Sequence, residues 1–177
     1  PETLLKQGFR DFEIIISDKG STDSTPTNCC EYEKRDSRFH YHRSEINHGP
    51  CWNYNRVFDL SNGKYFKWHA CDDLLKPDFL EKCVEVLDRC PDVILAYSYT
   101  AEIDERGRQI KDIDRTRIHT DHIRPSVRLR SMLMLGQYLS SAVFGLIRMD
   151  ILRNAPRQPA YAHGDIIFMC SLAIYGR

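Results

Sequence analysis

Short apolar runs alternate with longer segments over the first 100 residues, and this alternation constrains the fold most. FEIII (12–16) and DVILAYSYT (92–100) have the apolar, β-branched character of buried strands. RFHYHR (38–43) and KYFKWHA (64–70) are two further predicted strands. Each run is separated from the next by a segment long enough for a helix. The alternation predicts an α/β fold with a mostly parallel sheet and helices on both faces.

Helix start signals occur between the predicted strands. A polar turn, whose Ser and Thr residues can cap a helix, leads into residues 23–35. Pro50 suits the first position of a helix that runs through about Leu60. Pro77 begins a third helix that ends near Arg89, with an apolar stripe of Phe79, Leu80, Cys83, Val84 and Leu87.

The pattern changes after residue 100. AEIDERGRQI (101–110) is typical of an antiparallel hairpin with Gly107 in its turn. No internal repeat or interdomain linker is evident, so we expect one domain over 1–177. The other elements expected here are a charged loop over 115–125, a helix over 126–136 closed by Gly136, a strand running into a helical turn over 141–153, and an amphipathic helix over 164–176.

The charge balance limits the partners. The 177-residue chain has 25 Lys and Arg and 25 Asp and Glu, so its net charge is zero. A broad surface for nucleic acid needs excess positive charge, so we expect no nucleic-acid partner. No apolar run reaches the ~18 residues of a membrane span. Because the chain lacks an initiator Met and stops within a predicted helix, we expect a fragment truncated at both ends.

The cysteines indicate the compartment. There are seven, an odd number, and no Cys-x-x-Cys pair occurs. This pattern favours free thiols in a reducing environment over a disulfide framework. Residues 1–10 contain no apolar stretch of the kind a secretory signal needs. We therefore expect a cytoplasmic protein, either free or associated peripherally with a membrane.

Acidic residues follow two of the predicted strands. Asp18 comes after the first strand, and the adjacent Asp72 and Asp73 come after KYFKWHA. Ligands bind outside the carboxyl ends of the strands in open parallel sheets, so these side chains can meet there. Two neighbouring carboxylates repel each other unless a hard cation such as Mg²⁺ or Mn²⁺ neutralises them. The alternative is a solvated loop stabilised by the dipole of the following helix.

Several motifs occur in a fixed order within DFEIIISDKGSTDST, NHGPCWNYNRVFDLSNGKYFKWHACDD and PDFLEKCVEVLDRCPDVILAYS. Their order and spacing resemble those of the GT-A glycosyltransferases of family 2, closely over residues 4–100 and loosely over 101–177. The chain departs from the family pattern at Ala70, where the first aspartate of the acidic loop is usual, and at Tyr54, where an arginine is common. The matching positions are Asp18 to Asp23, Asn47 and Gly49 followed by Asn55, Gly63 and Tyr65, and Asp72 with Asp73.

The resemblance implies a fold and an activity. The fold is the Rossmann-like GT-A fold, with a mostly parallel sheet flanked by helices and an antiparallel acceptor-side portion. Residues 1–100 would bind the nucleotide sugar and 101–177 would form the acceptor side. The implied activity is an inverting hexosyl transfer, dependent on Mg²⁺ or Mn²⁺, from a nucleotide-diphosphate donor to a carbohydrate or other hydroxyl acceptor. A UDP-sugar is the expected donor.

The resemblance also implies roles for individual residues. Asp18 would contact the base or ribose of the donor, and Asn47 and Asn55 would line the nucleotide pocket. Asp72 and Asp73 would hold the cation against the diphosphate, so that Asp72 also belongs to the donor site. The residues alone leave other interpretations open. Asp18 can form an Asx turn, and the two asparagines can cap loops or helices.

Asp165 is the predicted catalytic base. Sugar transfer with inversion needs a carboxylate that takes the proton of the attacking hydroxyl. The family places this group at the start of a late helix, and Gly164-Asp165 in YAHGDIIFM matches that position. The alternative is an aspartate that only stabilises the helix N-terminus. Two other function classes stay open, a nucleotidyltransferase and a non-catalytic domain that binds nucleotide sugars.

Overall fold

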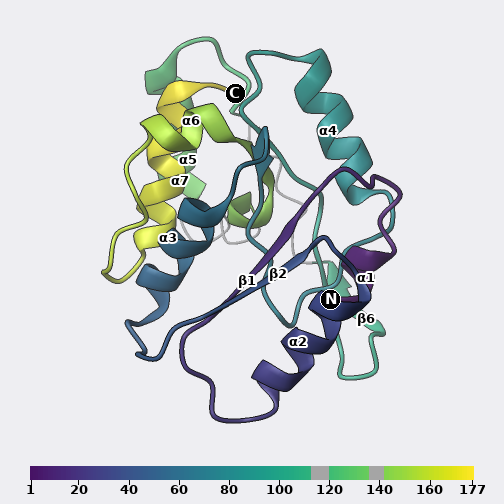
Figure 1. Cartoon of the computed structure of the whole chain (residues 1–177). Coiled ribbons are helices and arrows are strands. Elements are labelled where there is room, and N and C mark those ends of the chain that lie inside the picture. Colours follow the sequence, from purple (N-terminus) through teal and green to yellow (C-terminus); the bar gives the residue numbers. More distant parts are fainter. Residues whose placement is uncertain (113–119, 136–141) are drawn as a thin grey trace.

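The computed structural model describes residues 1–112, 120–135 and 142–177. It is a mixed α/β structure in which helices lie on both sides of the strands, α3, α5, α6 and α7 on one side and α1, α2 and α4 on the other (Figure 1). None of the described helices is long and apolar enough to cross a membrane. The helices are α1 (Glu2–Leu5), α2 (Thr25–Arg35), α3 (Pro50–Leu60), α4 (Phe79–Arg89), α5 (Pro125–Leu135), α6 (Met149–Asn154) and α7 (Gly164–Tyr175).

The first two strands form the predicted parallel pair. β1 (Ile14–Asp18) and β2 (Phe39–Arg43) are joined through α2 and pair in parallel from Ile14 opposite Phe39 to Asp18 opposite Arg43. The crossover helix is what allows parallel neighbours. Because both strands end at the same edge, the register places Asp18 beside a cationic side chain.

A second, three-stranded sheet carries the antiparallel part of the fold. β7 (Leu146–Arg148) lies between β3 (Tyr65–Phe66) and β4 (Leu95–Ala96) and is antiparallel to both. The predicted strands over 64–70 and 92–100 are therefore much too long. An apolar run indicates that a segment is buried, but a strand also needs a neighbouring strand to pair with. Here that neighbour is β7, which has only three residues.

The second half confirms the hairpin and the helices. β5 (Ala101–Ile103) and β6 (Gln109–Asp112) pair antiparallel, with Gly107 at φ 73° in the turn. This left-handed conformation favours glycine. Residues 142–144, expected in a strand, form a 3-10 helix instead. Part of the expected loop over 115–125 lies outside the described residues. Gly136, where the helix was expected to end, also lies outside them.

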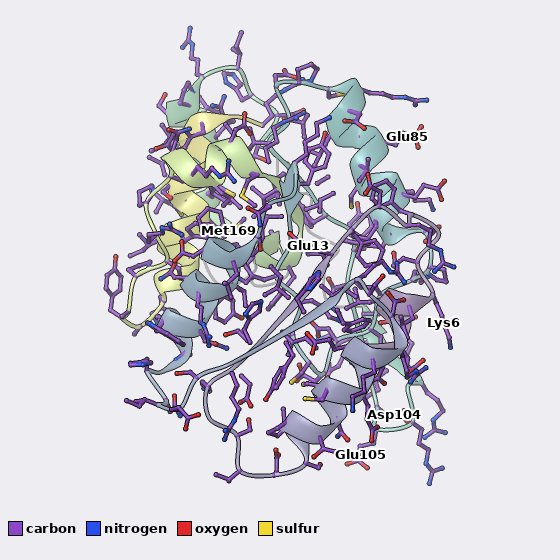
Figure 2. All side chains as sticks on the ribbon, viewed as in Figure 1. Lys6, Glu13, Glu85, Asp104, Glu105 and Met169 are labelled. Atoms are coloured by element: carbon purple, nitrogen blue, oxygen red, sulfur yellow. The ribbon has the colours of Figure 1, made fainter. Side chains whose placement is uncertain are left out.

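A chain of aromatic rings links the layers of the core. Phe58 of α3 meets Phe66 of β3 at 5.6 Å between ring centroids, Phe66 meets Trp68 at 4.6 Å, and Trp68 meets Phe168 of α7 at 5.5 Å. All three contacts are edge-on, a favourable geometry for aromatic pairs. Met169 also lies inside this layer, whereas Lys6 and Glu85 point outward (Figure 2). The core thus fixes α3, β3 and α7 against one another.

Ile147 at the centre of β7 tests this packing. It is fully buried, and its backbone lies opposite both Phe66 and Leu95. Ile147→Ala is expected to lower the free energy of unfolding by about 2–5 kcal/mol, because it removes buried methyl groups and leaves a cavity. Urea unfolding measures the loss. The control Ile110→Ala, at a 63% exposed position, should change the value by no more than about 0.5 kcal/mol. Equal effects of the two substitutions would contradict the described core.

Candidate active site

Asp18 ends β1 with a buried, fully engaged carboxylate. Its Oδ1 accepts from the Ser21 backbone N–H at 2.8 Å, and its Oδ2 accepts from the Tyr41 hydroxyl at 2.7 Å. Arg43 Nε lies 3.6 Å from Oδ2. Burial alone would raise the pKa of Asp18, but these hydrogen bonds and the nearby cation together lower it below its ordinary value. A nucleotide group that reached this carboxylate would compete with Tyr41 for Oδ2.

The end of β1 is also joined to α3 by residues that the sequence did not single out. Ser17 Oγ donates to Asn53 Oδ1 at 2.6 Å, and Asn53 Nδ2 donates to the Ser17 carbonyl at 3.0 Å. Arg56 Nη1 donates to Ser17 Oγ at 3.3 Å. Asn53 and Arg56 are three residues apart and therefore lie on one face of the predicted helix. This spacing is the only sign in the sequence that they act together.

The two predicted nucleotide-pocket asparagines have different environments. Asn47 is exposed, and its Oδ1 accepts from the Gly49 N–H at 2.9 Å, which makes an Asx turn before α3. Asn55 is partly buried in α3, and both polar atoms of its side chain are engaged by the backbone of Gln158. The structure therefore does not bring these two side chains to a common partner.

Asp72 and Asp73 lie on an exposed loop that leads into α4. Partial loss of hydration raises the pKa of Asp73, and the adjacent charge of Asp72 raises it further, while the Lys67 ammonium acts in the opposite direction. Among the described residues, no group of three or more His, Cys, Asp or Glu side chains could hold a metal ion. Within the described part of the chain, the two adjacent carboxylates are thus exposed and belong to no larger cluster of such side chains.

The loop is fixed to α4 by a buried glutamine. Gln7 is fully buried, and its Oε1 accepts from the Leu80 N–H at 3.1 Å, in the first turn of α4. Its Nε2 donates to the Lys76 carbonyl at 2.8 Å. One side chain thus satisfies a donor at the helix start and holds the chain just after the acidic pair.

Lys67 precedes the acidic loop in the chain and was not predicted as a site residue. Its Nζ donates to the carbonyls of Trp68 at 3.0 Å and Phe144 at 2.5 Å. It also lies 5.1 Å from the centre of the Phe79 ring, a cation–π contact. Burial lowers the pKa of this lysine to about 8, against the attraction of Asp73. A lysine flanked on both sides by aromatic residues, in the run YFKW (65–68), was the available signal.

The pH dependence of stability tests the buried ammonium. Since the folded pKa is about 8 and the unfolded value is 10.5, the unfolded chain binds more protons between these pH values. Stability from this group therefore rises as the pH increases through that window. In urea unfolding, we expect the free energy of unfolding of wild type to increase relative to that of Lys67→Met between about pH 7 and about pH 9.5. Lys76→Met, an exposed lysine near the same loop, is the control. A constant difference between wild type and Lys67→Met would contradict a buried ammonium.

Asp165 lies in the first turn of α7, as predicted. It is partly exposed, and no hydrogen bond or ion pair with another described residue engages its carboxylate. The preceding His163 has φ 61°, so the helix begins from a left-handed residue. The position of the carboxylate is therefore set by the backbone of α7 rather than by a described side-chain partner.

Tyr54 of α3 experiences the charges of acidic residues from two separate parts of the chain. Burial raises the pKa of its hydroxyl, and the negative charges of Asp165, Asp73 and Asp72 raise it further. These charges come from the acidic loop after β3 and from α7, about 90 residues apart in the chain. The charges of the predicted cation ligands and of the predicted base therefore all act on one side chain, which the sequence had marked only as a departure from the family pattern.

The fold is that of GT-A proteins. S. aureus TarS matches 97% of this chain and 49% of its own, with a TM-score of 0.67 at 19% identity. The mannosyltransferase PcManGT from Pyrobaculum calidifontis, solved in complex with GDP-Man and Mn²⁺, matches 99% of this chain and 48% of its own, with a TM-score of 0.63 at 14% identity. These likenesses establish the GT-A fold.

The family follows from the sequence comparison. The profile of Glycosyl transferase family 2 matches residues 1–154, and the chain belongs to this family. An uncharacterized glycosyltransferase of Methanocaldococcus jannaschii is 29% identical over 112 residues, which are 63% of this chain and 39% of that protein. The putative glycosyltransferase EpsH of Bacillus subtilis is 30% identical over 116 residues, 65% of this chain and 33% of EpsH. The chain thus spans between a third and two fifths of these relatives.

Proposed function

We propose that this protein transfers a sugar from a nucleoside-diphosphate donor to an acceptor hydroxyl. The observation that carries the proposal is the match to Glycosyl transferase family 2, together with three carboxylates, Asp72, Asp73 and Asp165, whose charges all act on the Tyr54 hydroxyl. Such a site would combine two parts: the carboxylates of Asp72 and Asp73, which can bind a diphosphate through a cation, and Asp165, which can accept a proton. A domain that only binds nucleotide sugars would need the diphosphate-binding carboxylates but no proton acceptor. The presence of both favours an enzyme over a non-catalytic domain.

The acidic loop fits a divalent cation. Partial burial and, after it, the neighbouring charge of Asp72 raise the pKa of Asp73, and a cation would relieve the repulsion between the two carboxylates. Mg²⁺ is commonly bound by one or two carboxylates together with substrate phosphates, so a two-ligand site is sufficient. Asp72 and Asp73 would hold Mg²⁺ or Mn²⁺. Bound there, the cation would stabilise the charge that develops on the leaving diphosphate.

The donor side of the site is proposed at the ends of β1 and β3. Asp18 and the Asn47 turn would face the base and ribose, and Asp72 would face the diphosphate. UDP-GlcNAc is bound in a solved structure of S. aureus TarS, and GDP-Man in that of PcManGT. Both are nucleoside-diphosphate sugars, which supports this donor class. We take UDP as the first nucleotide to test.

The chemical step needs one proton acceptor. The acceptor oxygen forms a bond to the anomeric carbon, and the bond from that carbon to the phosphate oxygen breaks with its electron pair on the diphosphate. The hydroxyl proton passes to the Asp165 carboxylate. Attack from the face opposite the leaving group gives inversion. We propose a hexosyl group as the transferred sugar and a carbohydrate or other hydroxyl compound as the acceptor, as the family resemblance implies.

Calorimetry and a donor screen on the full-length protein test the proposal. UDP should bind with Mn²⁺ and lose most of its affinity when the cation is chelated. In the screen, a sugar donor with a suitable acceptor should release the nucleoside diphosphate. Release of pyrophosphate from a nucleoside triphosphate would instead support a nucleotidyltransferase. Tight binding of UDP-sugars without transfer to any acceptor would support a non-catalytic binding domain.

A further inference from the structure

Asn55 joins α3 to a segment far along the chain. Its Nδ2 donates to the Gln158 carbonyl at 3.0 Å, and the Gln158 N–H donates to its Oδ1 at 3.2 Å. The side-chain amide therefore pairs with both polar groups of one residue's backbone, as a neighbouring strand would. Two hydrogen bonds in this geometry fix the position and the orientation of Gln158.

Two further residues of α3 hold the neighbours of Gln158. Cys51 Sγ, one helical turn before Asn55, donates to the Pro159 carbonyl at 3.1 Å. Arg157 pairs with Asp59 at 2.6 Å, and its guanidinium lies 4.3 Å from the centre of a ring of the same helix. Three consecutive residues, 157–159, are thus attached to α3. We name them the tether segment.

The tether segment supports the start of α7. A Cβ built on Gly164 would lie 2.5 Å from the Pro159 carbonyl oxygen, so the two backbones are in close contact and only glycine fits there. Gly164 is the first residue of α7, and Asp165 follows it. Since no described side chain holds the Asp165 carboxylate, its place depends on this backbone contact.

We propose that Asn55 is a positioning residue for Asp165, acting through the tether segment, and not a nucleotide contact. Both polar atoms of its side chain are already engaged by Gln158, which leaves little capacity for a donor. The catalytic consequence rests on the proposed function, whereas the mechanical support of α7 does not. A displacement of about 1 Å can cost roughly 10²-fold in rate, so the effect is measurable.

The test uses four variants of the full-length protein. Asn55→Ala removes both hydrogen bonds, and Asn55→Ser shortens the side chain but keeps a polar hydroxyl. Gly164→Ala disturbs the same contact from the α7 side. Asn154→Ala is the matched control, because within the described residues the Asn154 side chain bonds only to the Asp150 carbonyl on α6. Asn55→Ser serves as the milder variant if Asn55→Ala does not fold.

Kinetics separate the two roles of Asn55. We expect Asn55→Ala and Gly164→Ala each to lower kcat by about 10- to 100-fold, with KM for the donor and UDP binding within about twofold of wild type. The double variant should be little worse than either single one, because both break one support. Weaker UDP binding with unchanged kcat would overturn the proposal and restore the nucleotide contact.

Hydrogen exchange without substrate distinguishes failure of this inference from failure of the proposed function. Amides of residues 158–166 should exchange faster in Asn55→Ala than in Asn154→Ala. Unchanged exchange would show that Asn55 does not support α7, whatever the activity. Faster exchange in a protein that transfers no sugar would refute the proposed function but leave the support intact. Faster exchange with an unchanged kcat in an active enzyme would refute the role in catalysis.

Discussion

Asp165→Asn is expected to lower turnover by roughly 10²–10⁴-fold, the usual contribution of a positioned proton acceptor. The amide has the same shape as the carboxylate but cannot take the hydroxyl proton. Because Asp165 is bound to no other described side chain, the substitution should leave the start of α7 in place. The loss should therefore appear in kcat, with donor binding unchanged.

The measurement is a steady-state assay of nucleotide release together with calorimetry of UDP and Mn²⁺. Asp150→Asn provides a matched control, since Asp150 is also an aspartate in the first turn of a helix, α6. A helix-stabilising role would give the two variants similar, small effects, because such charges are worth about 0.3–1 kcal/mol. An Asp165→Asn enzyme that kept the full rate would refute the assignment of the base.

The double variant Asp72→Asn with Asp73→Asn is expected to abolish cation-dependent donor binding. A divalent ion on a diphosphate contributes several kcal/mol, and about 2.7 kcal/mol corresponds to 100-fold in affinity. UDP affinity in Mn²⁺ should therefore fall by about 100-fold or more. The residual binding should no longer respond to a chelator, since the variant has lost both carboxylates that would hold the ion.

Single variants show how the two carboxylates share this role. Partial burial and the charge of Asp72 raise the pKa of Asp73 and the Lys67 ammonium opposes this, and the single variants test whether the two positions are equivalent. Asp78→Asn, which removes a carboxylate at the start of α4 that pairs only with Lys82, is the control and should leave binding unchanged. If the double variant bound UDP and Mn²⁺ as wild type does, the cation site would have to lie elsewhere.

Local sequence patterns were sufficient for much of the fold. The β-branched run before Asp18, the proline at Pro50 and the glycine at Gly107 each act within a few residues, and the structure has the expected strand, helix start and hairpin turn there. The expected strand lengths over 64–70 and 92–100 were wrong, because pairing depends on a partner more than 50 residues further along the chain.

Some residues of the candidate site could likewise be identified from the sequence, and others could not. Asp18, Asp72, Asp73 and Asp165 were identified from their places after strands or at a helix start, which the sequence displays directly. Their assigned roles stay predictions. Lys67 and Tyr54 were not identified, since what distinguishes them is burial and the charges around them, and both are set by distant segments.

The sequence by itself determined the order of the strands and helices, the family motifs and the acidic residues at the sheet edge, because each depends on neighbours along the chain. Only the tertiary structure decided that Asn55 pairs with a backbone 103 residues away and that the charges of three carboxylates act on Tyr54. Periodicity describes which face of an element is buried but carries no information about which other element will cover it.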